Sequence, residues 1–178
     1  MKTNIRLTGT GGQGLILAGI ILAEAALLEG KNAIQSQSYG PEARGGASKA
    51  EVIVADEAIH YPKVLESDYL LSMSEKAYEK YSGGMKEGSV LIVDTTFIEE
   101  RPNPKAGKIV AVPITKLAKE ATGREMTANI AALGILSALG IVAEEPLKKA
   151  ILHRIPKGTE ELNMKAFEVG KNSVASVN

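Results

Sequence analysis

The sequence predicts an α/β fold, an open and mostly parallel sheet with helices on both faces. Two observations predict it. Short continuous apolar segments alternate along the chain with longer helix-forming segments, and a glycine-rich turn joins the first apolar segment to the first helix. Continuous apolar strands are typical of parallel sheets, which are buried on both faces by their crossover helices. Because the 178 residues contain no linker, repeat or low-complexity tract, we expect one domain spanning residues 1–178.

The elements follow from the same alternation. The segments predicted as strands are Asn4–Thr8, Asn32–Ser36, Glu51–Ala55, Tyr69–Ser72, Val90–Asp94 and Lys108–Val112. The segments predicted as helices are Leu15–Leu28, Glu75–Tyr81, Ile114–Ala121, Ala128–Ile141, Glu145–Leu152 and Thr159–Gly170. The first and fourth of these helices are apolar almost all round, so they cannot both present a polar face to water. We expect one to be fully buried and the other to lie partly under a partner chain, or under a second copy when the chain is isolated.

The composition excludes several classes of function. Lysine plus arginine and aspartate plus glutamate number 21 each, so no net field attracts nucleic acid or an anionic membrane. The least polar stretch, Ile130–Ala143, is shorter than the roughly 20 residues that span a bilayer. The absence of cysteine excludes disulfides and thiolate metal sites, and the first residues lead into a strand rather than a signal peptide. We therefore expect a cytoplasmic protein with neither nucleic acid nor membrane as its partner.

No catalytic group stands out in the sequence. His60 and His153 are the only histidines and lie far apart, and no metal-binding, nucleophile-elbow or paired-carboxylate motif is present. Asp94 lies at the end of a predicted strand, but one acid there is weak evidence of catalysis. We predict a chain that binds an anionic ligand or a partner and that has neither a catalytic residue nor a metal of its own.

The strongest local signal is the glycine loop, residues Gly9–Gly14, between the first predicted strand and helix. Gly9, Gly11 and Gly14 match the spacing G-x-G-x-x-G, and Gly12 and Gln13 complete the loop. In Rossmann-like folds the first glycine permits a tight turn, the second lets backbone approach a phosphate, and the third lets the helix pack closely on the sheet. Free N–H groups at the helix N-terminus then bind the anion. The alternative is a tight turn that binds no ligand.

The residues of the second predicted strand argue against NAD as the ligand. A dinucleotide site of the NAD type requires an acidic residue at the end of that strand to hold the ribose. The segment Lys31–Ser36 contains no acid, and Glu29 falls at the end of the preceding helix. The lysine-bearing phosphate loop is absent too, because Gly14 is followed by Leu15. A self-sufficient NAD(P)-dependent oxidoreductase is therefore the weaker alternative.

A second glycine-rich loop follows the second predicted strand. In an open parallel sheet the loops after the first two strands lie at the same edge, so we expect both loops to face one ligand. Arg44 can bind a phosphate or carboxylate through both arms of its guanidinium group, and Tyr39 can stack on a ring or donate a hydrogen bond. The alternative is a surface loop in which Arg44 pairs with Glu42. The other residues predicted to bind here are Gly40, Gly45 and Gly46.

Polar residues open the otherwise apolar fourth helix. Thr127 is expected to cap this helix, and Asn129 lies in its first turn. Asn129 either belongs to the cap or points its amide into the ligand site or an interface. We include Asn129 among the predicted binding residues.

Taken in order, these motifs resemble the gamma subunit, or gamma domain, of 2-oxoacid:ferredoxin oxidoreductases. The resemblance covers essentially the whole chain and rests on the segments Gly9–Gly14, Gln37–Gly46, Asn129–Gly134 and Asn163–Gly170. It implies an α/β subunit without an iron–sulfur cluster, in agreement with the absence of cysteine. The compact length most resembles the separate-chain 2-oxoglutarate type, although pyruvate, branched-chain 2-oxoacid and indolepyruvate enzymes share this kind of chain.

The resemblance also implies how the work is divided. Thiamine diphosphate with Mg would be bound by partner alpha and beta chains, and a ferredoxin-like delta chain would carry iron–sulfur clusters. The assembled enzyme would decarboxylate the 2-oxoacid oxidatively, form an acyl-CoA and pass electrons to ferredoxin. This chain would help to hold coenzyme A at the two glycine loops and would bind no cofactor covalently. A purely structural subunit that bridges its partners without a ligand is the remaining alternative.

Overall fold

The computed structural model describes residues 1–38 and 46–177. The strands are β1 (Lys2–Thr10), β2 (Asn32–Gln37), β3 (Ala47–Ala55), β4 (Ser67–Ser72), β5 (Met85–Asp94) and β6 (Ala106–Val112). The helices are α1 (Leu15–Leu28), α2 (Glu75–Tyr81), α3 (Ile114–Thr122), α4 (Ala128–Ala138), α5 (Glu144–Arg154) and α6 (Glu160–Ser173). Short 3₁₀ turns are η2 (Ser82–Gly84), η3 (Glu125–Thr127) and η4 (Val174–Ser176). Each predicted strand and helix is present, with ends that differ by a few residues.

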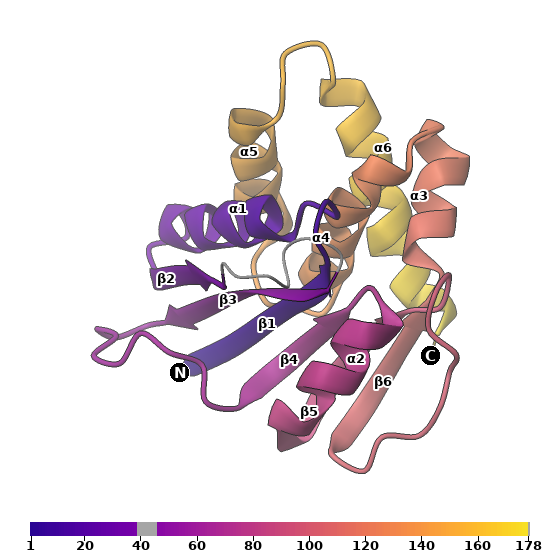
Figure 1. Ribbon diagram of the computed structural model, residues 1–178. Coiled ribbons are helices and arrows are strands. Elements are labelled where there is room, and N and C mark those ends of the chain that lie inside the picture. Colours follow the sequence, from indigo (N-terminus) through magenta and orange to yellow (C-terminus); the bar gives the residue numbers. More distant parts are fainter. Residues whose placement is uncertain (39–45, 178) are drawn as a thin grey trace.

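The strands form one sheet with helices on both faces, which confirms the predicted fold class (Figure 1). Within the described residues the sheet is six-stranded, in the order β2-β3-β1-β4-β5-β6. The strands β1, β4, β5 and β6 are parallel to one another. The sheet is therefore mostly parallel, as the apolar strands indicate.

The strand β3 departs from the parallel arrangement. It pairs antiparallel with β1, from Lys2 opposite Ala55 to Thr10 opposite Ala47, and antiparallel with β2 on its other side. The chain therefore turns back after β2 and places β3 between β1 and β2. Because β2 still runs in the direction of β1, the two strands end at the same edge of the sheet, as expected. The antiparallel β3 begins at that edge too.

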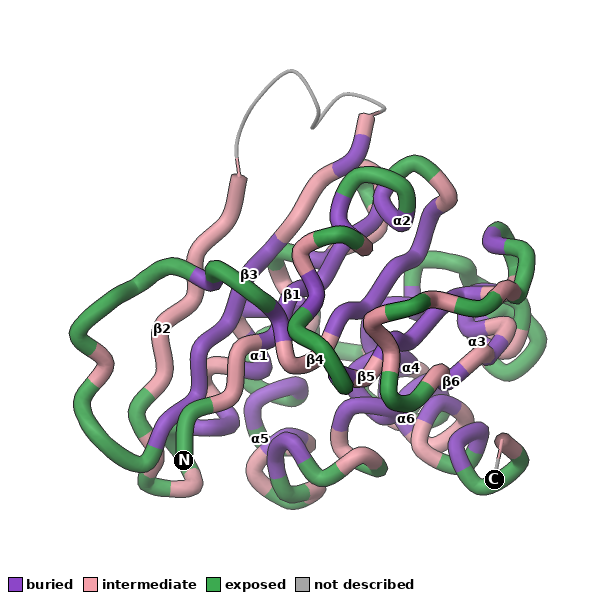
Figure 2. The backbone as a smooth tube through the Cα atoms, turned by 90° about the horizontal axis from the view of Figure 1, so that it is seen from below, coloured by how far each residue is buried: buried purple, intermediate pink, exposed green. Residues whose placement is uncertain are grey.

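The helices cover the two faces of the sheet unequally. On one face, the core joins Ile5 and Leu7 of β1 to α1, α3, α4, α5 and α6. On the other face, a smaller core packs Tyr78 and Tyr81 of α2 against strands such as β4 and β5. The central strands are buried along most of their length, whereas the edge strand β2 is mostly half-buried (Figure 2).

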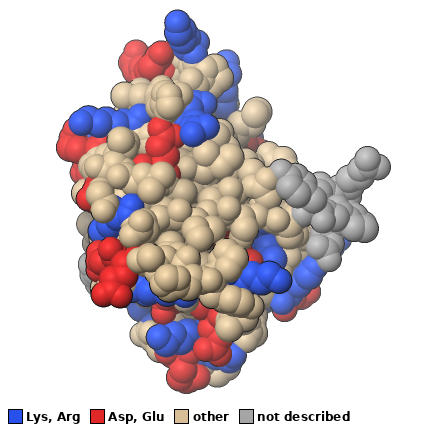
Figure 3. All heavy atoms as spheres, turned by 90° about the vertical axis from the view of Figure 1, so that its left-hand side faces the viewer, with Lys and Arg blue, Asp and Glu red and all other residues tan. Residues whose placement is uncertain are grey.

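The two apolar helices have different surroundings. The helix α4 is buried from Ala128 to Leu136, whereas α1 packs one side on β2 and β3. The other side of α1 presents an apolar row, which we call the α1 stripe, and Leu27 in this row is 56% exposed. Figure 3 shows a broad area without charged atoms on this side of the molecule. The α1 stripe consists of Ile16, Ile20, Ala23 and Leu27.

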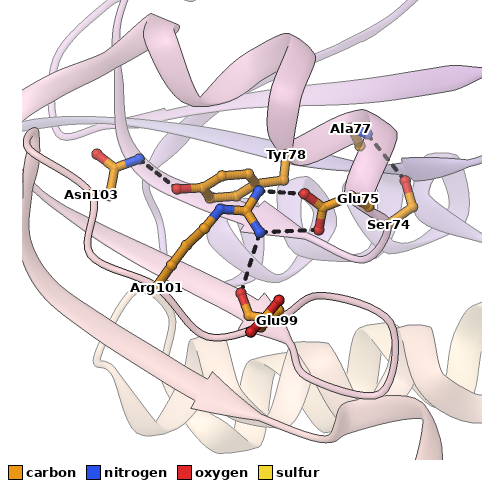
Figure 4. A network of polar contacts seen from close by, with 7 residues as sticks. All are labelled: Ser74, Glu75, Ala77, Tyr78, Glu99, Arg101 and Asn103. Carbon is orange, nitrogen blue, oxygen red and sulfur yellow. Dashed lines mark hydrogen bonds and ion pairs between the residues drawn. The ribbon is translucent and has the colours of Figure 1, made fainter.

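The connection between β5 and β6 is fastened to α2 through Arg101 (Figure 4). Its guanidinium group pairs with the carboxylate of Glu75 and lies 4.2 Å from the centre of the Tyr78 ring. Arg101 also donates to the Glu99 carbonyl at 3.3 Å, and the amide of Asn103 donates to the Tyr78 hydroxyl at 3.0 Å. The hydrogen bond with Glu75 raises the pKa of Arg101 above its usual value. These contacts hold the turn-rich segment against the face of the sheet that α2 covers.

Thr127 lies at the N-cap position of α4, as predicted, but its side chain does not cap the helix. Thr127 adopts helical backbone angles, and its Oγ1 donates to the Arg124 carbonyl at 2.8 Å rather than accepting from an N–H group of α4. The physical reason is the turn η3, which runs directly into α4. Thr127 is therefore already part of a helical turn and is not an extended residue outside the helix.

Candidate functional site

The candidate site lies at the carboxyl edge of the parallel strands. Here β1 ends at Thr10, and the glycine loop leads from it into α1. Gly46 directly precedes Ala47, the residue of β3 that pairs with Thr10. The structure thus brings Gly46 close to the glycine loop. The other predicted residues of the second loop lie outside the described residues: Tyr39, Gly40, Arg44 and Gly45.

The glycine loop presents the N-terminus of α1. Gly12 and Gly14 have φ angles of +89° and +74°, which side chains rarely adopt. The Gly14 carbonyl accepts the first intrahelical hydrogen bond, from Ala18 at 3.0 Å. The N–H groups of the first turn have no acceptor within the helix, and none of the described residues in that turn is acidic. The positive end of α1 is therefore not neutralised by its own side chains.

The side chain of Gln13 bridges two strands. Its Oε1 accepts from the backbone N–H of Thr10 at 2.7 Å, and its Nε2 donates to the Met73 carbonyl at 3.0 Å, just after β4. Gly9 provides the space for this amide, because a Cβ on Gly9 would overlap Gln13 Oε1. The missing side chain of Gly9 thus makes room for the Gln13 amide and not for a ligand.

Asn129 connects α4 to the glycine loop. It is 6% exposed, and its Nδ2 donates to the Gly14 carbonyl at 3.2 Å while its Oδ1 accepts from the Ile130 N–H at 2.9 Å. The structure therefore brings Asn129 to the predicted site. Its amide contacts the loop itself.

Two of the grooves beside the glycine loop reach both Gly12 and Gly14. The first has a volume of 550 Å³, runs along the α1 stripe and contains Lys49 of β3. The second has a volume of 320 Å³, lies between α4 and the connection from α5 to α6, and contains Arg124. Each groove is largely apolar, and among the described residues Lys49 is the one basic residue that lines the first and Arg124 the one that lines the second. This arrangement suits a long ligand that has anionic groups between less polar parts.

Comparison with known proteins identifies the family. Residues 4–173 match the family described as pyruvate ferredoxin/flavodoxin oxidoreductase. The chain belongs to this family. The 2-oxoglutarate synthase subunit KorC of Methanocaldococcus jannaschii is 49% identical over 173 residues, which cover 96% of this chain and 92% of that protein. The chain is thus a subunit of an oxidoreductase that acts on an oxo group with ferredoxin as acceptor.

Solved structures agree with this membership. The keto/oxoacid ferredoxin oxidoreductase gamma subunit from Geobacter sulfurreducens has a TM-score of 0.90 and 46% identity, covering 99% of this chain and 98% of that one. A 2-oxoglutarate:ferredoxin oxidoreductase from Magnetococcus marinus, with 2-oxoglutarate, coenzyme A and succinyl-CoA bound, has a TM-score of 0.87. It is 24% identical and the match covers 99% of this chain and 32% of that one, so this likeness shows the fold alone. The resemblance to a gamma subunit is confirmed.

Asp94 and His153, two polar residues that stand out in the sequence of this gamma subunit, have structural partners. Asp94 is fully buried, and its Oδ2 accepts from Thr115 Oγ1 at 2.6 Å, which fixes the start of α3. His153 on α5 pairs with Glu24 of α1 at 2.5 Å. Among the described residues, no group of three or more metal-ligating side chains comes together. In the same part of the chain, no helix combines the length and apolar character needed to cross a membrane.

Sequence reasoning missed the two basic residues that line the grooves, Lys49 and Arg124. Lys49 lines the larger groove because β3 is antiparallel and therefore begins at this edge. Its ammonium group, however, pairs with Glu51 at 3.1 Å and lies 5.8 Å from the centre of the Tyr81 ring of α2, on the other face of the sheet. Arg124 follows Gly123, whose φ of +77° ends α3. A helix-stop glycine followed by a basic residue is visible in the sequence. The distance of Arg124 from the glycine loop, however, depends on how α3 and α4 pack. The sequence alone does not show this packing.

Proposed function

We propose that this gamma subunit serves a cytoplasmic enzyme of the 2-oxoglutarate type and supplies part of its coenzyme A site. The observation that carries this function is the N-terminus of α1, which opens between two largely apolar grooves, the smaller of which is lined by Arg124. Phosphate groups bind at such helix ends. The substrate type is supported by the similarity to 2-oxoglutarate synthase subunit KorC.

Coenzyme A suits the shape of this edge. It is a long molecule with a pyrophosphate between an adenosine end and a thiol-bearing arm. Its pyrophosphate would lie against the backbone of Gly11, Gly12 and Gly14, and its two ends would follow the grooves of 550 Å³ and 320 Å³. Arg124 would then face phosphate oxygens. In this proposal Tyr39, Gly40, Arg44, Gly45 and Gly46 complete the site from the second loop.

The bond-breaking chemistry takes place on partner chains in this proposal. The chain has no cysteine and so cannot hold an iron–sulfur cluster through thiolates. Thiamine diphosphate and Mg are assigned to alpha and beta chains, iron–sulfur clusters to a ferredoxin-like delta chain, and the final electrons to ferredoxin. The gamma subunit holds coenzyme A where a partner chain can acylate its thiol. By itself it is inactive.

The α1 stripe is the surface we assign to docking. It begins at Ile16 and Ile20, which also line the larger groove, and continues to Leu27. A partner seated on this stripe would therefore border the proposed coenzyme A site. An apolar surface of this kind is typically covered in an assembly. We expect a second copy to cover it when the chain is isolated.

Reconstitution with and without the chain tests this function. The complex of alpha, beta and delta chains should lose coenzyme A-dependent activity when the gamma subunit is omitted. With Gly11→Val in the gamma subunit, the branched side chain should block the approach of a phosphate and raise the KM for coenzyme A at least about tenfold. Gly83→Val is the matched control, because a Cβ on Gly83 meets no atom within 4 Å. Unchanged KM values in Gly11→Val and Arg44→Ala would favour the ligand-free bridge instead.

The NAD-dependent alternative meets a structural obstacle. An acidic residue at the end of β2 would hold the ribose only if β2 lay next to β1. Here β3 separates β2 from β1, and residues 32–37 contain no acid. Isothermal titration of the assembled enzyme with NAD, NADP and coenzyme A distinguishes the two functions. Tight binding of NAD without binding of coenzyme A would reverse our assignment.

A further inference from the structure

Two amide side chains fix the glycine loop from opposite sides. Gln13 ties the start of the loop to the end of β4 through its bonds to Thr10 and Met73. Asn129 ties the end of the loop to α4 through its bond to the Gly14 carbonyl. A side chain on Gly14 would displace Asn129, because a Cβ there would lie 2.5 Å from Asn129 Nδ2. The motif glycines Gly9 and Gly14 thus make room for these two amides.

The helix that carries Asn129 is itself held in place by a close crossing with α6. A Cβ on Gly134 of α4 would overlap the Phe167 carbonyl oxygen and would lie 2.8 Å from the Lys171 nitrogen. A Cβ on Gly170 of α6 would lie 2.6 Å from the Ala131 carbonyl carbon. The backbones of α4 and α6 are therefore nearly in contact, and neither helix can shift along the other freely. This crossing fixes the position of α4 along α6, and it therefore fixes where Asn129 contacts the glycine loop.

We propose, building on the proposed coenzyme A site, that Gln13 and Asn129 are positioning residues: although Asn129 also lines the smaller groove, both act by holding the loop in its binding conformation. Their amides are already bonded to backbone groups of the loop or its neighbours. What the loop offers to an anion is then its backbone N–H groups and the start of α1. A loop fixed before binding loses little conformational entropy when the ligand arrives. Both side chains therefore contribute to the affinity of the enzyme for coenzyme A and not to its turnover rate.

This role predicts a particular kinetic pattern in the reconstituted enzyme. Gln13→Met keeps the length of the side chain but removes both of its hydrogen bonds, and Asn129→Ala removes the bond to Gly14. Each variant should raise the KM for coenzyme A about tenfold, the effect of losing about 1.4 kcal/mol of binding free energy. The kcat at saturating coenzyme A and the KM for 2-oxoglutarate should be unchanged. Asn103→Ala, which removes an amide bonded to Tyr78 far from the loop, should leave all three values unchanged.

A second measurement separates positioning from direct contact. Hydrogen exchange is followed by mass spectrometry over residues 9–17 in the assembled enzyme without coenzyme A. The Thr10 N–H donates to Gln13, so Gln13→Met should accelerate exchange in this segment, and Asn129→Ala should do so at its end. Faster exchange together with a raised KM is the expected result.

Two other results would overturn the proposal. A raised KM with unchanged exchange in the ligand-free enzyme would mean that the amides contact coenzyme A themselves. Unchanged KM values in Gln13→Met and Asn129→Ala would remove both residues from the binding function. In that second case Gly11→Val serves as the reference. If it still raises the KM, the coenzyme A site stands and only the positioning role fails, whereas an unchanged KM there would contradict the proposed function as well.

Discussion

Gly170 of α6 lies so close to Ala131 of α4 that a Cβ on Gly170 would stand 2.6 Å from the Ala131 carbonyl carbon. Both segments belong to the motifs through which the sequence resembles its family, and the crossing explains why glycine is needed there. We predict that Gly170→Ala lowers the free energy of unfolding by about 3 kcal/mol, because overpacking forces two helices apart. Chemical denaturation followed by circular dichroism measures this loss.

The matched control for that substitution is Gly83→Ala. Gly83 lies in η2, and a Cβ on it would meet no atom within 4 Å. The control should change the free energy of unfolding by no more than about 0.5 kcal/mol, as is usual for surface substitutions. Equal losses in the two variants would show that a general cost of replacing glycine, and not the helix crossing, decides stability.

A buried ion pair gives the second prediction. Arg6 of β1 and Glu51 of β3 are 6% and 8% exposed, and Arg6 Nη2 lies 2.9 Å from Glu51 Oε2. Arg6→Met leaves a buried carboxylate with Lys49 as its partner at 3.1 Å, and should cost about 3 kcal/mol of the free energy of unfolding. The double variant Arg6→Met/Glu51→Leu should be more stable than Arg6→Met alone. Thermal unfolding of the three proteins measures both differences, and a double variant less stable than the single one would contradict this reasoning.

The contact between α1 and α5 should depend on pH. Burial alone would raise the pKa of Glu24, but hydrogen bonds from Arg154 and His153 outweigh it and hold the pKa below its usual value of 4.5. A carboxylate with a lowered pKa stabilises the folded state above the pKa of the unfolded chain, and this contribution is lost as pH falls through the folded value. Glu24→Gln should therefore cost about 1 kcal/mol near neutral pH and progressively less below about pH 4.5. Urea unfolding of both proteins across this range measures the difference, which must shrink on acidification.

Much of the fold was predictable because its signals are local. Each strand is a short apolar run, and each helix carries an apolar side or ends near a glycine such as Gly30. The direction of β3 was not predictable, because an apolar run such as Glu51–Ala55 reads the same whether the strand is parallel or antiparallel. Its direction is set by which neighbour it pairs with, which is a tertiary property.

The location of the candidate site was predictable from the sequence, but the roles of its residues were not. The glycine spacing identified the loop, whereas the bond from Gln13 to Met73 spans 60 residues and that from Asn129 to Gly14 spans 115. Contacts over such separations leave no local pattern. From the sequence, Gln13 and Asn129 are therefore predicted to bind the ligand, although in the structure their amides form hydrogen bonds with the loop and its neighbours.

The uncharged α1 stripe leads to the last prediction, on assembly. Leu27 is 56% exposed beside the half-buried edge strand β2, so Leu27→Glu should be tolerated by the fold while placing a charge where an apolar partner would sit. We predict that the isolated chain is a dimer in light scattering, that Leu27→Glu makes it a monomer, and that this variant also assembles poorly with the partner chains. Leu65→Glu is the control, because Leu65 is 73% exposed and lies in the connection between β3 and β4 rather than in α1. A charge at Leu27 that leaves both assemblies intact would show that partners dock elsewhere, since burying an unpaired carboxylate in an apolar contact is costly.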